Sequence, residues 1–214
     1  MAHSALEFLS NYGRCARIGG TALTEVELAH IWVRWGALSR SLISTRVAVE
    51  RERSFWEDLN FTNKSQLKLK AGSGGQRFTI KLVDHVAALE DEGTVLAATL
   101  ILSYALAESA ALDRLGVDAR QAKGIEDWGS LLLEHAGQDW SKVTDGLGGA
   151  AEVGVMRNLI AHGQAAVDEK SIARLKRSGS KSFRLGEPIA LDYERVGIYR
   201  ARLRSLLTEG GLGT

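Results

Sequence analysis

The sequence predicts a mainly α-helical protein: a helical bundle, with an N-terminal helical extension and a small β-hairpin near the C-terminus. The chain of 214 residues holds one proline, Pro188, so long stretches can remain helical without a break. Apolar residues recur at helical spacing over most of the chain, as they do on the buried face of a helix. A hydrophobic content of 45% and a charged content of 25% suit a folded, globular protein.

The N-terminal part is predicted to be one long helix from Thr24 to about Asn60. Thr24 and Glu27 form a capping-box pattern at its start, in which each side chain satisfies a free backbone N–H. A glycine-rich stretch, Ala71-Gly-Ser-Gly-Gly-Gln76, follows it. This stretch lacks the Gly-Lys-Ser/Thr end of a phosphate-binding loop, so we interpret it as a hinge. The predicted parts of the chain are a helical extension over 1–70, a glycine-rich loop over 71–78 and a helical domain over 79–214.

Glycines mark helix ends in the predicted main domain. A helix over 94–115 is apolar around almost its whole circumference, which indicates a central buried helix, and Gly116 ends it. Gly163 ends a later helix in the same way. Two short apolar runs flank Gly186-Glu-Pro188 and predict the hairpin. The expected elements are a helix from 79, helices over 94–115, 125–135, 150–162 and 193–207, and hairpin strands over 182–185 and 189–191.

Cysteine content and apolar runs predict where the protein works. The single cysteine, Cys15, rules out an internal disulfide framework and suits a reducing compartment. The N-terminus has no basic segment followed by an apolar core, so no secretory signal is expected. The most apolar run, 95–107, is too short to span a bilayer. The expected location is the cytoplasm, without membrane association.

Local basic patches are the candidate sites for a polyanion, because a net charge of +1 gives no strong overall attraction. The arginines of the long N-terminal helix form either a solvated face or a stripe that follows RNA. These arginines are Arg34, Arg40, Arg46, Arg51 and Arg53. The basic segment from Arg174 to Arg184 either contacts RNA phosphates or is a solvated loop. The five tryptophans are interpreted as core residues rather than as platforms for stacked bases.

Arg157, Asn158 and His162 form the candidate functional site. The stretch reads Arg157-Asn158-Leu-Ile-Ala-His162, and a glycine follows it at the end of a predicted helix. On a helical projection, Met156 and Ile160 define the core side. Asn158 and His162 lie opposite that side, and Arg157 lies on its flank. Polar groups on a face that the helix does not bury in its own domain indicate a surface for a ligand or a second subunit.

These residues resemble the signature of the HEPN superfamily: an arginine, then four to six residues, then a histidine, very often with asparagine directly after the arginine. Here four residues separate Arg157 from His162, and Asn158 is in place. The order of elements adds to the resemblance, because a buried helix with an acidic residue and a connector that contains tryptophan precede the motif helix. The resemblance covers about residues 79–207.

The resemblance implies a four- or five-helix bundle that forms a homodimer, with the motif helices of the two copies facing each other across one composite cleft. It also implies metal-independent cleavage of RNA. Arg157 and His162 are then the catalytic residues, and Asn158 and Glu108 support them. A histidine titrates near neutrality and can activate the ribose 2′-OH, and an arginine can bind phosphate oxygens through its planar fork. No metal or other cofactor is expected, because no Cys/His cluster has metal-ligand spacing.

Glu108 interrupts the otherwise apolar central helix, and a buried carboxylate needs a partner. One hypothesis is an ion pair with Arg157 that aims the guanidinium at the site. The alternatives are a pair with another cation, or a position on a partly hydrated flank of the helix. The sequence does not decide among these three readings.

The predicted function is therefore that of a homodimeric endoribonuclease in a toxin, defence or RNA-processing system. Its partners would be an RNA substrate and, in a toxin system, an antitoxin protein. One alternative is a catalytically silent domain of the same type that binds RNA or a partner protein. Another is a purely structural helical dimerisation module. The presence of both Arg157 and His162 favours the enzyme, since a silent domain could lose either residue.

Overall fold

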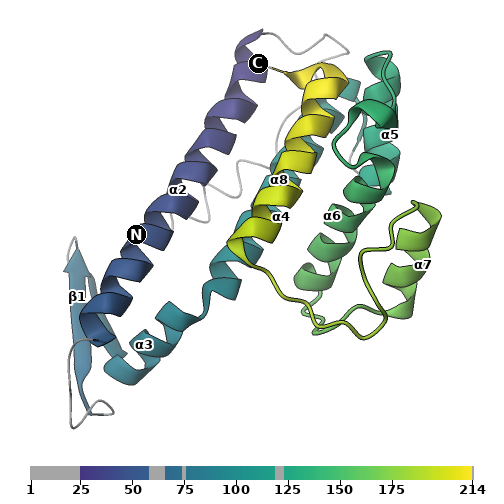
Figure 1. Ribbon diagram of the computed structural model, residues 1–214. Coiled ribbons are helices and arrows are strands. Elements are labelled where there is room, and N and C mark those ends of the chain that lie inside the picture. The colour runs from purple at the N-terminus through teal and green to yellow at the C-terminus, as the bar shows by residue number, and fades with distance from the viewer. Residues whose placement is uncertain (1–24, 58–65, 74–75, 119–122, 214) are drawn as a thin grey trace.

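A computed structural model of the protein describes residues 25–57, 66–73, 76–118 and 123–213. They form a mainly helical bundle with one small hairpin, which confirms the predicted fold class (Figure 1). The elements are α2 (Glu25–Glu57), β1 (Lys68–Ser73), β2 (Gln76–Lys81), α3 (Leu82–Glu90), α4 (Glu92–Leu115), α5 (Ile125–His135), the short turn η2 (Trp140–Lys142), α6 (Gly146–Ala161), α7 (Glu169–Arg177), α8 (Tyr193–Leu207) and the C-terminal turn η3 (Thr208–Leu212).

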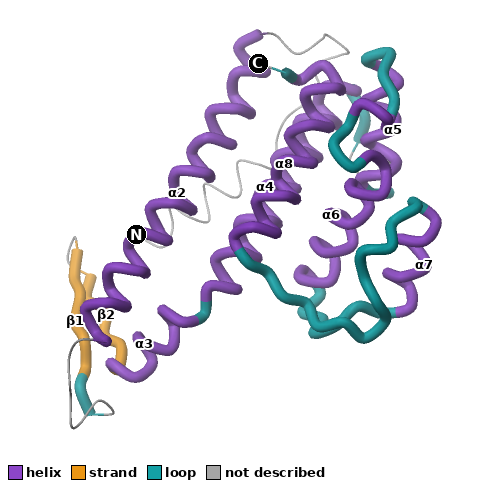
Figure 2. Tube along the Cα trace, in the orientation of Figure 1, coloured by secondary structure: helices purple, strands orange, loops and turns teal. Residues whose placement is uncertain are grey.

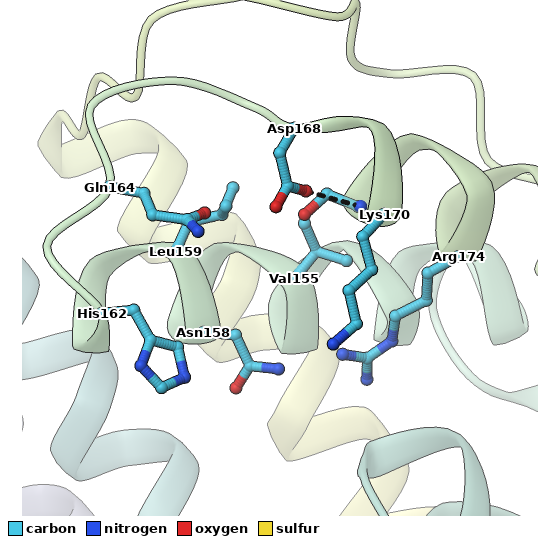
Figure 3. A pocket seen from close by; sticks show the side chains of 9 residues that line it. Val155, Asn158, Leu159, His162, Gln164, Asp168, Lys170 and Arg174 are labelled. Carbon is cyan, nitrogen blue, oxygen red and sulfur yellow. Dashed lines mark hydrogen bonds between the residues drawn. The ribbon is translucent and has the colours of Figure 1, made fainter.

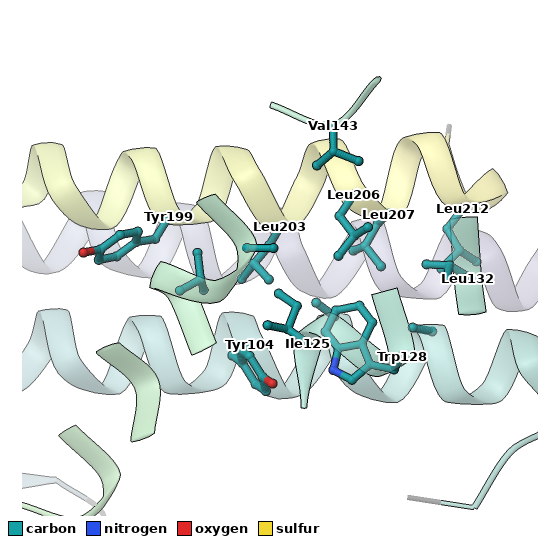
Figure 4. Packing of buried hydrophobic residues seen from close by; sticks show 14 of the residues in the cluster. Tyr104, Ile125, Trp128, Leu132, Val143, Tyr199, Leu203, Leu206, Leu207 and Leu212 are labelled. Carbon is teal, nitrogen blue, oxygen red and sulfur yellow. The ribbon is translucent and has the colours of Figure 1, made fainter. Parts of the chain in front are cut away.

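Helix α4 is the centre of the bundle, because α2, α5, α6 and α8 all pack against it. Its residues Leu100, Ala107 and Ala111 are completely buried. The rings of Tyr104 in α4 and Trp128 in α5 meet edge to face, with 6.2 Å between their centroids. Leucine side chains of α8 point toward these rings (Figure 4). The prediction of a central buried helix is therefore confirmed.

By length and composition alone, α4 could also cross a membrane, and it is the one helix of the described residues that could. The helix extends beyond the apolar run 95–107 in both directions. The short length of the run 95–107 therefore does not exclude a membrane-spanning helix. In the folded chain, the helix has the packing of a core helix, since neighbours contact it from several sides.

Helix α2 packs against the same core and is part of the bundle. Ile31 and Trp35 are each 7% exposed and belong to the main hydrophobic cluster. Arg200 of α8 donates a hydrogen bond to the carbonyl oxygen of Trp35 at 3.3 Å. Helices from the two ends of the chain therefore support each other. The predicted ends of the first helix, Thr24 and Asn60, lie outside the described residues.

The hairpin lies elsewhere than predicted (Figure 2). Strands β1 and β2 pair antiparallel, with Lys68 opposite Lys81 and Ser73 opposite Gln76. The predicted glycine-rich loop over 71–78 is wrong, because both of its ends belong to strands. The helix expected from residue 79 begins instead at Leu82, after the second strand.

The hairpin predicted near the C-terminus is not formed by the described residues 182–191. That segment makes one isolated bridge, between Ala166 and Pro188. Its backbone groups bond to an earlier loop, since the N–H of Gly186 donates to the carbonyl of Val167 and the N–H of Ile189 donates to the carbonyl of Ala165. The turn predicted at Gly186 is present, but the segment pairs with a loop about twenty residues earlier in the chain and not with itself.

Several predicted helix ends are confirmed. Helix α5 spans the predicted residues, and Gly116 and Gly163 take left-handed conformations, each with a φ of 63°, after α4 and α6. Helix α6 begins at Gly146, four residues earlier than predicted. The preceding Asp145 has a φ of 59°, so a left-handed turn directs the chain into the helix.

Helix α7 covers one side of α6 through a second, smaller hydrophobic cluster. The cluster consists of Ala151, Val155, Leu159, Val167 and Leu175. Gly154 allows the neighbouring elements to approach α6 closely. A Cβ at this position would lie 2.7 Å from Nη2 of Arg174 and 2.9 Å from Cγ2 of Ile125. A larger residue therefore has no room there.

Gly154→Ala is expected to destabilise the fold by about 1–3 kcal/mol, because overpacking a tight contact forces its neighbours to shift. Gly197→Ala is the matched control, since a Cβ at this position of α8 would meet nothing within 4 Å. The control should be stabilised by up to about 1 kcal/mol, because alanine is the better helix former. Urea denaturation measures both free energies of unfolding. Equal stabilities of the two variants would contradict the tight packing at Gly154.

Candidate active site at the end of helix α6

Helix α6 ends in a capping turn that positions the predicted site residues. The backbone N–H of His162 donates to the carbonyl of Asn158 at 3.0 Å, and the N–H of Gln164 donates to the carbonyl of Leu159 at 2.9 Å. Gly163 has a left-handed φ of 63° and allows the chain to reverse. The side chain of His162 is therefore exposed at the very end of the helix.

The free polar face predicted for α6 exists only at its last turn. Ala151 and Val155 lie on that side of the helix, but they are 0% and 2% exposed because α7 packs over them. Asn158 is half-buried and His162 is exposed. The prediction of a face open along the whole helix is wrong, since the covering helix comes from later in the chain.

A pocket of about 130 Å³ lies where α6 meets α7. Asn158 and His162 line it together with Lys170 and Arg174, and the four side chains point to the same side in Figure 3. Sequence reasoning did not single out Lys170, and it placed Arg174 in a basic segment without linking it to the motif. The pocket combines an amide, an imidazole and two cationic groups, which is a set suited to phosphate oxygens.

Arg174 is held in place by Glu126 of α5. Its Nε donates to Oε1 of Glu126 at 2.6 Å, and its Nη2 donates to Oε2. Burial acts to raise the pKa of Glu126, but the hydrogen bonds and charge of Arg174 outweigh it, and the pKa lies below its ordinary value. Arg174 therefore links α5 to α7, and exposed Lys170 is the less constrained cation of the pocket.

Arg157 contacts α4 rather than the pocket. Its guanidinium carbon lies 5.2 Å from the ring centroid of Tyr104. Its Nη1 donates to Oδ1 of Asn158 at 2.9 Å, and its buried Nε has no hydrogen-bond partner. Asn158 therefore connects the two predicted catalytic residues, because it bonds to Arg157 and lines the pocket with His162.

Glu108 lies near Arg157 without a direct ion pair. Among the described side chains, no carboxylate oxygen of Glu108 is within 4 Å of a cationic nitrogen. Burial raises the pKa of Glu108, while the charge of Arg157 and the indole N–H of Trp128 oppose the rise. The indole N–H falls short of regular hydrogen-bond geometry. The charge of Arg157 therefore lowers the pKa of Glu108, but the two groups lie farther apart than the hypothesis of an ion pair between them required.

Two arginines of the candidate stripe on α2 make contacts within the chain. Arg53 of α2 forms an ion pair with Glu92 at 3.3 Å. Arg46 lies over the ring of Tyr193, with 4.3 Å to its centroid. Because Arg53 and Arg46 already contact Glu92 and Tyr193, these contacts argue against a continuous RNA-binding stripe on α2. The segment that begins at Arg174 starts within helix α7, so the loop predicted there is wrong for its first part.

The function of this site is inferred from its geometry, because the comparisons with known proteins found no match. No protein-family model, no curated protein and no solved structure matches the chain. Within the part of the chain that the structure describes, no group of three or more His, Cys, Asp or Glu side chains is placed to hold a metal ion.

Glu108→Gln is expected to stabilise the fold at neutral pH. The pKa of Glu108 is higher in the folded state than in the unfolded state, so stability falls as the pH rises through the interval between the two values. Glutamine stays neutral and avoids this loss. Urea unfolding at about pH 7 should show a more stable variant, and the difference should shrink at about pH 3.5. A variant that is less stable at neutral pH would instead support a stabilising pair with Arg157.

Proposed function

We propose that the protein is a metal-independent endoribonuclease that acts as a homodimer. The observation that carries the proposal is the polar end of α6, where Asn158 bonds to Arg157 and lines a pocket with His162. The same residues carry the resemblance to the HEPN signature. An imidazole, a guanidinium and an amide beside an open pocket are groups that can cleave an RNA phosphodiester bond.

In the proposed reaction, His162 accepts the proton of a ribose 2′-OH. The 2′ oxygen attacks the adjacent phosphorus, and the bond from phosphorus to the 5′ oxygen of the next nucleotide breaks. Arg157 stabilises the negative charge that develops on the phosphate oxygens. The departing 5′ oxygen takes up a proton from water or from the second histidine of the dimer. The products are a 2′,3′-cyclic phosphate and a 5′-hydroxyl.

A second copy would complete this arrangement. Within one chain, Arg157 lies over Tyr104 of α4, whereas His162 lies in the pocket beside α7. Two motif ends that face each other across a two-fold axis would bring Arg157 of one copy toward His162 of the other. A closed isologous dimer is the commonest way to duplicate one surface in this manner.

The main alternative is a catalytically silent domain that binds RNA or a partner protein, such as an antitoxin, through the same surface. One observation favours it. The hydrogen bond from Arg157 to Asn158 uses an N–H that catalysis would direct at the phosphate. Substrate would have to displace that bond for Arg157 to act.

Purified protein is expected to cut single-stranded RNA in the presence of EDTA and to leave a 2′,3′-cyclic phosphate. DNA of the same sequence should resist, because it has no 2′-OH. His162→Ala should lower the rate by about 10²-fold or more, because it removes the proton acceptor. Electrophoresis of a labelled oligonucleotide and mass spectrometry of its ends measure these results. His135→Ala, which alters another exposed histidine at the end of α5, should keep the parent rate.

Two results would overturn the proposed mechanism: loss of cleavage on chelation, or efficient cutting of DNA. Binding of RNA without any cleavage would support the silent domain instead. Each result is distinct, so the two functions can be separated with the same purified protein.

Mixing two inactive variants tests the composite site. Arg157→Ala and His162→Ala should each be inactive alone. After their subunits exchange, part of the parent activity should return, because a mixed dimer holds one intact arginine and one intact histidine across the axis. Light scattering should show a dimer at micromolar concentration. A monomer, or a mixture as inactive as its components, would contradict shared catalysis.

A further inference from the structure

The hairpin has two chemically different faces, because successive residues of a strand point to opposite sides. One face is apolar and carries Leu69, Ala71, Phe78 and Ile80. The other face is basic and carries Lys68, Lys70, Arg77 and Lys81. All four cationic residues are exposed. The hairpin lies beside the C-terminal end of α2 and beside α3 in Figure 2.

Positive charge is concentrated in this part of the sequence. Residues 59–83 hold five lysines or arginines and no aspartate or glutamate. The rest of the chain holds the other 22 basic residues and all 26 acidic ones. The net charge of +1 therefore conceals a cationic hairpin on an otherwise slightly acidic protein.

The basic face is unfavourable for the isolated hairpin. Lys68 and Lys81 are directly opposite each other across the strands, and like charges in such a pair are destabilising. Among the described residues, no carboxylate lies within 4 Å of the cationic nitrogens of this face. A polyanion that binds several of these cations at once would relieve their repulsion.

The apolar face covers a pocket of about 370 Å³ against α2 and α3. Its walls include Leu69 and Ile80 of the hairpin. Aromatic rings from three elements also line it: Trp56 of α2, Phe78 of β2 and His85 of α3. Phe78 is 61% exposed, so its ring is available to a ligand. The interpretation of every tryptophan as a core residue is therefore wrong for Trp56.

Glu52 supplies polar chemistry in this pocket. Its Oε1 accepts a hydrogen bond from Nε1 of Trp56 at 2.7 Å and lies 3.2 Å from Nε2 of His85. These contacts fix the carboxylate and the indole relative to each other. Both use Oε1, so Oε2 can accept a hydrogen bond from a ligand N–H. A flat ring with N–H groups at its edge therefore fits both the apolar walls and this acceptor.

We propose that the hairpin is a binding arm for single-stranded RNA, with phosphates on its basic face and one unpaired base in the pocket. Lys70 borders both surfaces, because it belongs to the basic strand face and also lines the pocket. A base that enters the pocket places its phosphate beside Lys70. The choice of RNA among polyanions rests on the proposed ribonuclease function, whereas the two surfaces stand on their own geometry.

Equilibrium binding tests the arm separately from catalysis. His162→Ala serves as the background, and fluorescence anisotropy follows a labelled 12-nucleotide single-stranded RNA over a series of salt concentrations. Adding Lys68→Gln and Lys81→Gln should weaken binding at low salt by about tenfold or more. It should also reduce the slope of log K against log salt by about 1.4, since each phosphate contact with a single strand contributes about 0.7. The control pair is Lys123→Gln and Lys142→Gln, two exposed lysines outside the hairpin, and it should retain the parent slope.

Phe78→Leu tests the pocket, because it keeps an apolar side chain but removes the aromatic face. It should weaken binding about fivefold or more while leaving the salt slope unchanged, since stacking does not depend on counterion release. Ile198→Leu, which alters an exposed apolar residue of α8 outside the pocket, should bind as the parent does. Circular dichroism confirms that each variant is folded. The binding arm is overturned if the hairpin lysine pair behaves as its control pair does. Base binding in the pocket is overturned if Phe78→Leu binds RNA as well as Ile198→Leu does.

Discussion

The burial of α4 is the constraint on which the rest of the structure depends. An apolar helix with buried residues along its length must be covered from several sides, and α2, α5, α6 and α8 supply that cover. Helix α6 cannot present a whole face to solvent under this constraint, because α4 and α8 cover one side and α7 covers another. The polar residues therefore collect at the single turn that these neighbours leave open, which includes Asn158 and His162.

Arg157, the part of the candidate site outside the pocket, lies where polar groups interrupt the contact between α4 and α6. Tyr104 and Glu108 face this contact from α4, and Arg157 faces it from α6. Burial and the charge of Glu108 raise the pKa of Tyr104 to about 12, so the phenol stays neutral at physiological pH. The Tyr104 ring beneath the guanidinium is therefore uncharged. Glu108 is the residue of α4 whose negative charge acts on Arg157. The position of Arg157 is therefore set by the Tyr104 ring and by Asn158, while the charge of Glu108 acts on it from beyond ion-pair distance.

Local signals in the sequence predicted helix ends well and tertiary contacts poorly. Gly116 and Gly163 were predictable, because a left-handed cap depends on the residue itself and on the turn before it. The cover of α6 by α7 was not predictable, because Val155 and Leu175 share a hydrophobic cluster that depends on how the loop between the two helices folds back. At the site, the motif residues and the open end of the helix were predicted. Lys170 was missed, because no spacing in the sequence links it to His162.

The missed hairpin shows why overall charge is a poor guide to polyanion binding. The alternation of polar with apolar residues from Leu67 to Ala71, and again from Arg77 to Lys81, has the period of a strand. The glycines between them suggested a hinge, although they equally suit the turn of a hairpin. Each strand alone carries two cationic residues on its basic face. Pairing the strands places all four on one face of the hairpin and doubles the density of positive charge there. Charge attracts a polyanion over a range of about 10 Å at ordinary salt, so this local density matters more than the sum over the chain.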